Sequence, residues 1–425
     1  MRLTISPTNR FFLADGRPFF YLGDTVWSAF TNPTLEEWRH YLAYRRRQGF
    51  NTLQISILPI LHDASESDLE YTPFARGADG QWDFSAPSAA YFEHAAELLA
   101  AARDEGFIPA LVLLWCNYVP NTWASKRHPD AIMPLDAVAG YVQYVANAFA
   151  RFDPIFIVSG DTDFVAPESS QHYRTALHTI KQLCPEALTT MHLAPQADLP
   201  DEFVRSSELD FYMFQSGHHI EEESRAYVLA ERFSTKVVTK PVVNGEPAYE
   251  GHGHGFQYAR FSAPEVRRAT WQSLLSGASA GVTYGAHGIW SWHRSGNAFT
   301  SVAFSMYPFD WHDALHLEGA WDISFARALF ERYDLFGLES RQDLLVDAPP
   351  AIRAAASVGE ECVAVYVPWA TEVMVELNGS VYQWSTINLA TRRWEDTLVT
   401  ARRKRTVIGM QRSNGDMVAI GKRLS

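Results

Sequence analysis

The sequence predicts an α/β fold: a (β/α)8 TIM barrel over residues 1–338, followed by a small β-sandwich over residues 339–425. The first observation is length, because 425 residues exceed the roughly 250 of a typical barrel and leave room for a second module. The second is an alternation of strand-like and helix-like segments up to about residue 336. The third is a change to short strand-like runs with turn signals from about residue 340.

The predicted strands are continuous apolar runs rather than alternating ones, which indicates parallel strands buried on both faces. After a hairpin turn at Asp15-Gly16, the strands are predicted at residues 19–25, 51–58, 108–115, 155–161, 188–194, 210–218, 236–246 and 281–292. Eight such units fit a closed barrel better than an open doubly wound sheet. No GxGxxG or P-loop motif opens a helix, so a nucleotide-binding fold has no support.

Helices are predicted between these strands from periodic apolar residues and from cap and stop signals. They span residues 34–49, 88–106, 136–150, 168–183, 220–232 and 263–277, with a short helical turn near 200–207 and a last helix within 313–336. Thr34 is the expected cap of the first helix and Gly49 its stop.

Two features of the C-terminal part predict turns. Asn378-Gly379, between "VMVEL" and "SVYQW", is a two-residue hairpin signal. The basic run "ARRKR" at 401–405 lies between strand-like neighbours and is interpreted as a charged turn or edge.

Composition limits the partners. The net charge of −13 gives no electrostatic support for binding nucleic acid or an anionic membrane. The longest apolar run, around "IPALVLLWC", is too short to span a bilayer. No secretory signal is visible and three widely separated cysteines do not form a disulfide framework, so a cytoplasmic location is expected, although a secreted protein that had lost its signal would look the same. The oligomeric state is unknown from the sequence.

Polar and aromatic residues gather at the predicted carboxyl ends of the strands, where barrels carry their chemistry. Aromatic rings at such ends, Trp115, Trp290 and Trp292, are candidates for stacking on a sugar, whereas Trp38 and Trp271 on helices are expected in the core. The polar and aromatic residues at the strand ends are Asp24, Trp27, Gln54, Trp115, Asn117, Asp161, His192, Gln215, His218, Glu246, Tyr284, His287, Trp290 and Trp292.

Two carboxylates within this set carry the functional interpretation. The seventh predicted strand ends at Asn244-Gly245 within "KPVVNGEPAYE", so Glu246 lies at the carboxyl end of the sheet. Asp161 follows the fourth predicted strand. Glycoside hydrolysis needs two carboxyl groups flanking one bond, and the ends of strands four and seven lie across a barrel mouth. Asp161 could instead cap the next segment. Asp163 competes for the acid role, and Glu250 is the competitor of Glu246.

A metal-dependent reaction has weaker support. His218-His219 and the "HGHG" stretch with His252 and His254 are suggestive, but no HExxH motif or Cys pair accompanies them. No metal and no cofactor are therefore expected. His218 and His287 are expected to hydrogen-bond sugar hydroxyls instead.

Seven motifs recur together: "FFYLGDTVW", "GFNTLQ", "YFEHAAELLAAARDEGF", "SGD", "FQSGH", "KPVVNGEPAYE" and "TYGAHGIW". In this order, from about residue 5 to 335, they resemble the apiosidase-like (DUF4038) family of glycoside hydrolases. The β-rich tail resembles the small module that often follows this catalytic domain.

The resemblance implies an exo-acting and retaining barrel enzyme that releases a terminal sugar, apiose or a related furanoside, from pectin or another plant or bacterial glycan. It implies Asp161 as acid/base and Glu246 as nucleophile, with a pKa of Asp161 raised by burial and by the charge of Glu246. It also places four residues at the sugar site: Asp24, Gln215, His218 and His287.

Two departures from the family concern the pocket. Ser159 stands where members typically have glycine, and the third strand ends in "WCNYVPNTW" instead of a Gly-Asp-Lys-like sequence. The sugar therefore stays open, with arabinose or galactose, as furanoside or pyranoside, as alternatives. The other classes considered are a non-catalytic carbohydrate-binding barrel and a metal-dependent hydrolase.

Overall fold

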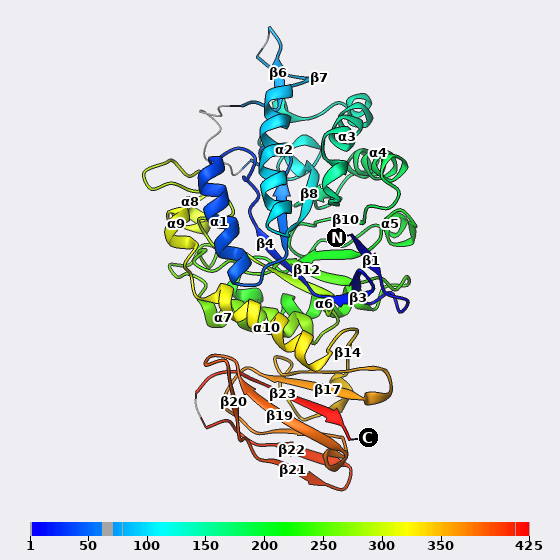
Figure 1. The fold of residues 1–425 in the computed structure, drawn as a ribbon, viewed down its shortest axis with the longest axis vertical. Coiled ribbons are helices and arrows are strands. Elements are labelled where there is room, and N and C mark those ends of the chain that lie inside the picture. Colours follow the sequence, from blue (N-terminus) through cyan, green and yellow to red (C-terminus); the bar gives the residue numbers. More distant parts are fainter. Residues whose placement is uncertain (1, 62–70, 79, 413, 425) are drawn as a thin grey trace.

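Eight parallel strands form a barrel in the N-terminal part of the chain (Figure 1). This computed structural model describes residues 2–61, 71–78, 80–412 and 414–424. The barrel strands are β4 (Tyr21–Thr25), β5 (Thr52–Ser56), β8 (Ile108–Trp115), β9 (Ile155–Gly160), β10 (Thr189–Thr190), β11 (Tyr212–Gln215), β12 (Val242–Glu246) and β13 (Gly281–Tyr284). Parallel pairing runs from β4 to β10, and from β11 through β13 back to β4. The predicted (β/α)8 barrel is confirmed.

The seam between β10 and β11 is closed by irregular hydrogen bonds. The N–H groups of Asp210 and Phe211 donate to the carbonyl of Thr189 at 3.0 and 3.4 Å. The Thr190 hydroxyl donates to the carbonyl of Phe211 at 2.8 Å. These bonds satisfy backbone groups that would otherwise form an open sheet edge.

Each barrel strand is followed by helical structure that covers the outside of the barrel (Figure 1). The helices are α1 (Leu35–Arg47), α2 (Ala89–Asp104), α3 (Leu135–Phe149), α4 (Pro167–Leu183), α5 (Asp201–Arg205), α6 (Arg225–Ser234), α7 (Ala263–Leu274), α8 (Val302–Ser305), α9 (Trp311–Ala314) and α10 (Gly319–Tyr333). Thr34 caps α1 in a capping box with Glu37, as predicted for that position.

Several predicted elements differ in extent, the fifth strand among them, since β10 keeps only two of the predicted residues 188–194. The seventh strand begins only at Val242, because Pro241 before it has no N–H to donate to a sheet and Val237 is largely exposed. The eighth strand ends at Tyr284, and the segment to Trp292 forms turns. The helix predicted at 220–232 starts as a 3-10 turn, Ile220–Glu222, before α6 begins.

A three-stranded antiparallel sheet precedes the barrel: β1 (Leu3–Ile5), β2 (Phe12–Ala14) and β3 (Arg17–Phe19). Its β2–β3 turn is at Asp15-Gly16, where both residues have positive φ (49° and 78°), so the predicted hairpin is confirmed. Phe12 packs edge-on against Phe211 of the barrel, with ring centres 5.0 Å apart.

The C-terminal part consists of two packed antiparallel sheets. The larger holds β14 (Glu339–Ser340), β16 (Arg353–Ala356), β17 (Cys362–Val367), β23 (Met417–Arg423), β19 (Tyr382–Asn388) and β20 (Arg393–Glu395). The smaller holds β15 (Leu345–Val346), β18 (Val373–Val375), β22 (Arg405–Ile408) and β21 (Val399–Arg402). Apolar side chains of both sheets, Val365, Val375 and Ile408 among them, form one core, as in a β-sandwich.

One turn prediction in this module is wrong and another is confirmed. Asn378-Gly379 does not close a hairpin, because β18 and β19 lie in different sheets and the segment crosses between them. Gly379 is needed there for another reason: a Cβ would lie 2.3 Å from Thr406 Oγ1. The basic run does form a charged turn, with Arg402 paired to Arg405 across the β21–β22 hairpin.

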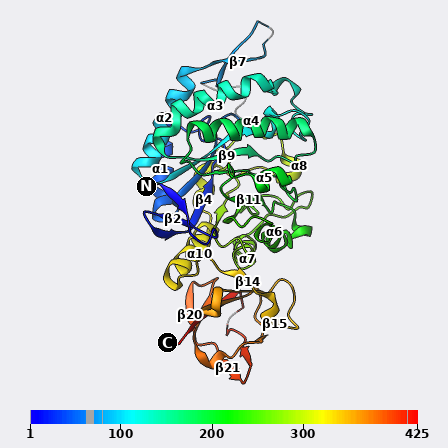
Figure 2. The same ribbon diagram turned by 90° about the vertical axis from the view of Figure 1, so that its right-hand side faces the viewer.

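The β-sandwich packs beneath α7 and α10 of the barrel (Figures 1 and 2). Arg267 on α7 donates to both carboxylate oxygens of Asp416 and, at 2.5 Å, to Asp322 on α10. The hydroxyl of Tyr366 also donates to Asp416, at 3.1 Å. Trp271, buried as predicted, stacks on the same tyrosine at 6.3 Å. A buried, fully paired charge cluster therefore joins the two parts.

We expect Asp416→Asn to lower the free energy of unfolding by about 3 kcal/mol, because it leaves the buried charge of Arg267 only partly balanced. Thermal unfolding followed by circular dichroism measures the change. The matched control is Asp396→Asn in the same module, at an exposed position. Equal melting temperatures for the two variants would contradict the expected contribution of this charge cluster to stability.

Candidate active site

A cavity of about 440 Å³ opens at the carboxyl ends of the barrel strands. Both predicted catalytic carboxylates line it, together with five of the predicted substrate-binding residues. The predicted residues in its wall are Asp161, Glu246, Trp27, Trp115, Gln215, His218 and Trp290.

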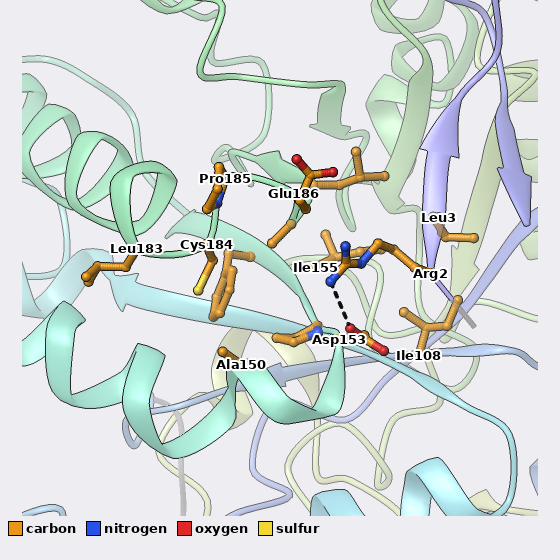
Figure 3. A pocket seen from close by; sticks show the side chains of 14 residues that line it. Arg2, Leu3, Ile108, Ala150, Asp153, Ile155, Leu183, Cys184, Pro185 and Glu186 are labelled. Atoms are coloured by element: carbon orange, nitrogen blue, oxygen red, sulfur yellow. Dashed lines mark hydrogen bonds and ion pairs between the residues drawn. The ribbon is translucent and has the colours of Figure 1, made fainter.

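A second cavity, of about 230 Å³, lies at the opposite end of the barrel, where β8 and β9 begin (Figure 3). Arg2 reaches Asp153 there at 3.3 Å, and Cys184 and Glu186 line its wall. Asp153 is also 3.6 Å from Arg103, so its charge is already balanced. Barrels carry catalytic groups at the carboxyl ends of their strands, and the first cavity is therefore the candidate active site.

The backbone of Glu246 is fixed at the end of β12. Its carbonyl accepts the N–H groups of Ser216 and Gly217, both at 3.1 Å. The preceding Gly245 packs so closely on Met213 that a Cβ would lie 2.3 Å from its side chain. A glycine at 245 therefore lets β12 approach β11 and brings the carboxylate of Glu246 beside the side chains that follow β11.

The two oxygens of the Glu246 carboxylate are held unequally. Oε1 accepts a hydrogen bond from Gln215 Nε2 at 2.7 Å and another from His218 Nε2 at 2.8 Å. Oε2 lies 3.3 Å from His192 Nε2. Oε1 thus accepts two hydrogen bonds, whereas Oε2 has only a longer contact with the imidazole of His192.

Backbone hydrogen bonds determine which nitrogen of each histidine carries its proton. His218 Nδ1 accepts the N–H of Tyr249, and His192 Nδ1 accepts the N–H of Asp161, both at 3.2 Å. In both neutral imidazoles the proton is therefore on Nε2, pointing at Glu246. Burial raises the pKa of Glu246, but the hydrogen bond from His218 and the contact with His192 outweigh burial and hold the pKa at about 2. Glu246 is ionised.

Asp161 has the opposite electrostatic environment. Burial, then the charge of Glu246, then that of Asp163 raise the pKa of Asp161 well above its ordinary value. Its Oδ1 is buried with no hydrogen-bond partner in the described part of the chain. Its backbone has positive φ (53°) and is held by the bond to His192 and by Trp123 Nε1, which donates to the Asp161 carbonyl at 2.9 Å. Asp163, the competitor for the acid role, does not line the cavity.

Aromatic side chains form much of the cavity wall. Trp27 and Trp115 meet edge-to-face with ring centres 5.0 Å apart, and the Trp27 indole N–H donates to the hydroxyl of Tyr249 at 3.0 Å. Gly160 makes room for Trp115, since a Cβ there would lie 2.3 Å from the indole. Trp290 completes this wall. Indole faces are suited to the C–H faces of a sugar ring.

Five predicted substrate-binding residues are placed behind the cavity wall, and their assignment to direct sugar contact is corrected here. They are Asp24, Gln54, Asn117, Tyr284 and His287, and all are buried.

Two of them bind charged side chains outside the cavity. Asp24 accepts from Arg45 Nε and from the Tyr41 hydroxyl, each at 2.6 Å. Tyr284 donates to Glu250 at 2.6 Å. Asp24 and Tyr284 are thus engaged by side chains outside the cavity and do not face it.

Of the other three, Gln54 and His287 support residues that line the cavity or directly precede one. Gln54 donates to the carbonyl of Gly245 at 2.8 Å, directly before Glu246. His287 accepts the indole N–H of Trp290 at 3.0 Å, and its Nε2 donates to the carbonyl of Met306 at 2.9 Å. Burial lowers the pKa of His287 to about 3, so the ring stays neutral. Asn117 lies in the 3-10 turn Cys116–Tyr118 after β8.

The expectation that Trp292 stacks on a sugar is also wrong, because Trp292 does not line the cavity. It stacks on Trp311 in the core with ring centres 4.8 Å apart, and Trp38 packs against it at 6.0 Å. The sequence missed Tyr249 and gave no role to His192. Both carried a weak signal, since Tyr249 lies three residues after Glu246 and His192 follows the fifth strand.

Within the described residues, no group of three or more His, Cys, Asp or Glu side chains is arranged to hold a metal ion. In the same part of the chain, no helix combines the length and apolarity needed to cross a bilayer.

Two carboxyl groups kept in opposite protonation states are the requirement of glycosidic-bond hydrolysis. This cavity shifts the pKa values of its two carboxyls in opposite directions, at the end of the barrel where the fold supports catalysis. The class that fold and site define is that of glycoside hydrolases.

The family follows from the comparison with known sequences. The description "Apiosidase-like, catalytic domain" matches residues 6–337, and the chain belongs to this family. Among curated protein sequences, none matches the chain.

Solved structures share the fold at low sequence identity. A protein described as a glycoside hydrolase is 20% identical with a TM-score of 0.79, covering 99% of this chain and 97% of the other. A glycoside hydrolase family 5 structure from Bacteroides vulgatus ATCC 8482 is 20% identical with a TM-score of 0.82, covering 99% and 93%. An exo-β-1,4-mannosidase from Opitutaceae bacterium strain TAV5 is 16% identical with a TM-score of 0.51, covering 77% and 63%.

The raised pKa of Asp161 predicts the pH dependence of kcat/KM for a glycoside with an unactivated leaving group. A general acid works only while protonated, so activity is present below the pKa of Asp161 and is lost as pH rises through it. Rates measured between about pH 4 and 10 should fall on the alkaline side, well above the ordinary aspartate value of about 3.9. A loss already complete near pH 5 would contradict the raised pKa.

Proposed function

We propose that the protein is an exo-acting, retaining glycosidase that releases a terminal sugar, apiose or a related furanoside, from a plant or bacterial glycan. The observation that carries the proposal is a pair of carboxyls in one cavity whose environments shift their pKa values apart, that of Glu246 to about 2 and that of Asp161 well above its ordinary value. Retention is part of the proposal because the family resemblance implies Glu246 as nucleophile, and it requires the two carboxyls to be close. Carboxyls about 5 Å apart are typical of retaining enzymes.

In the proposed first step, Glu246 Oε2 attacks the anomeric carbon and the glycosidic C–O bond breaks. The proton of Asp161 passes to the leaving oxygen, so the aglycone departs as an alcohol. In the second step, Asp161 takes a proton from water, the water oxygen bonds to the anomeric carbon, and Oε2 leaves as carboxylate. Asp161 is protonated again and the sugar keeps its anomeric configuration.

The size of the cavity supports action on a chain end. Its volume of about 440 Å³ lies in the lower part of the roughly 300–1,000 Å³ range of ligand pockets. A long internal stretch of polysaccharide would need an open groove. Arabinose or galactose, as furanoside or pyranoside, remains the alternative sugar. A purely carbohydrate-binding barrel is less well supported, since sugar binding alone does not require two carboxyls held in opposite states.

Arg127 supports an acidic glycan such as pectin as the source of the substrate. It lies at the cavity, is exposed, and stacks over Trp123 with its guanidinium carbon 5.3 Å from the ring centre. The same indole donates to the carbonyl of Asp161, so the cation lies on the side of the acid, where the leaving group departs. Within the described residues, no carboxylate pairs with Arg127.

Replacing the nucleophile should abolish turnover: Glu246→Gln is expected to lower kcat by at least about 10³-fold with the fold intact. The assay measures sugar release from a panel of aryl furanosides and pyranosides, including apiosides, with pectin oligosaccharides alongside. Asp163→Asn serves as the comparison, since Asp163 does not line the cavity, and should retain release. Full activity of Glu246→Gln would refute the assignment.

In Asp161→Asn, added azide should restore turnover and give a glycosyl azide of retained configuration. Azide is an anion and can attack the glycosyl-enzyme without a base to remove a proton, whereas water needs one.

Arg127→Gln should lower kcat/KM about tenfold for a glycoside whose aglycone carries a carboxylate, corresponding to the loss of one charge-assisted contact of about 1.4 kcal/mol. The corresponding neutral aryl glycoside should be hydrolysed at the wild-type rate. An equal effect on both substrates would show that Arg127 does not recognise the carboxylate of the leaving group.

A further inference from the structure

His192 is the side chain that touches both halves of the catalytic pair. Its Nδ1 accepts the backbone N–H of Asp161 at 3.2 Å, and its Nε2 lies 3.3 Å from Oε2 of Glu246. The side chain is fully buried, and Nε2 has no regular hydrogen bond in the described structure. A buried donor without a fully formed hydrogen bond is costly, so its presence beside the carboxylate of Glu246 needs an explanation.

The ring of His192 has little freedom to turn. It meets Trp27 edge-to-face at 5.4 Å and lies nearly parallel to Trp115 at 6.2 Å. Its backbone is tied to β9 as well, because its N–H donates to the carbonyl of Ser159 at 3.1 Å and its carbonyl accepts the Ser159 hydroxyl at 2.9 Å. The proton on Nε2 therefore has a fixed direction, toward the less occupied oxygen of Glu246.

We propose that His192 is a positioning residue that couples the acid to the nucleophile. Through Nδ1 it holds Asp161 in its left-handed backbone conformation (φ 53°), which aims the carboxyl at the leaving oxygen. Through Nε2–H it orients Oε2, the oxygen that attacks. The 3.3 Å contact is long enough to be released when Oε2 bonds to the anomeric carbon. This inference rests on the proposed retaining mechanism.

Two substitutions separate the two contacts. An asparagine side chain can place an acceptor where Nδ1 lies but does not reach Glu246. A glutamine can place an N–H where Nε2 lies but leaves the N–H of Asp161 without its acceptor. His192→Asn thus removes the contact to the nucleophile, and His192→Gln removes the contact to the acid.

The experiment compares kcat/KM for a dinitrophenyl glycoside, whose leaving group needs no acid, with that for an alkyl glycoside, whose leaving group does. His192→Asn should lose about 10²-fold on both substrates, because the nucleophile acts on both. His192→Gln should stay within about threefold of wild type on the dinitrophenyl glycoside and lose about 10²-fold on the alkyl glycoside. Equal losses on both substrates in both variants, as a packing role predicts, or no loss in either, would overturn the proposal.

His293→Gln is the matched control, a buried histidine outside the cavity, and it should leave the ratio between the two substrates unchanged. An inactive wild type would count against the proposed function and not against the contacts of His192. ¹⁵N NMR of histidine-labelled wild-type protein tests these contacts independently of activity and of the folding of variants. His192 should show a protonated Nε2 and an unprotonated Nδ1, and a protonated Nδ1 would overturn the proposal.

Discussion

The buried charge of Glu246 is the constraint on which the rest of the site depends. An ionised carboxylate in an aromatic cavity is stable only if donors replace the water it has lost. Gln215 and His218 supply two such donors to Oε1, and His192 faces Oε2. Because these groups are neutral, they stabilise the charge without cancelling it. Burial, and after it the charge of Glu246, then raise the pKa of Asp161 well above its ordinary value.

The two histidine donors and the nucleophile are themselves fixed by backbone groups. His218 is held by the N–H of Tyr249, and Glu246 by two N–H groups after β11. Gln54 crosses from β5 to the carbonyl of Gly245. The protonation states of the site thus follow from hydrogen bonds made by several different strands. Such bonds explain why a barrel, which brings many strand ends together, is a suitable frame for this chemistry.

The β-sandwich is linked to the barrel through buried charges and through apolar residues of its larger sheet, such as Tyr366 and Val418, which join the barrel core. Arg267, Asp322 and Asp416 are buried where α7, α10 and the module meet. The first residue of α10, Gly319, donates its N–H to Glu250 at 2.8 Å, and Glu250 also accepts from Tyr284 at the end of β13. A continuous set of contacts therefore leads from the module to the barrel strand next to the one that carries Glu246.

The sequence by itself determined the barrel, the β module, the Asp15-Gly16 hairpin and the position of two carboxylates at strand ends, because apolar runs, caps and turn residues are local signals. Only the tertiary structure decided which strand-end side chains face the cavity. Asp24 and Tyr284 turn away from the cavity, toward Arg45 and Glu250, which bind them, and nothing in their spacing reveals that direction. The Asn378-Gly379 turn failed for the same reason, since its strands found partners far along the chain. The proton positions on His192 and His218 likewise depend on backbone groups that only folding brings near.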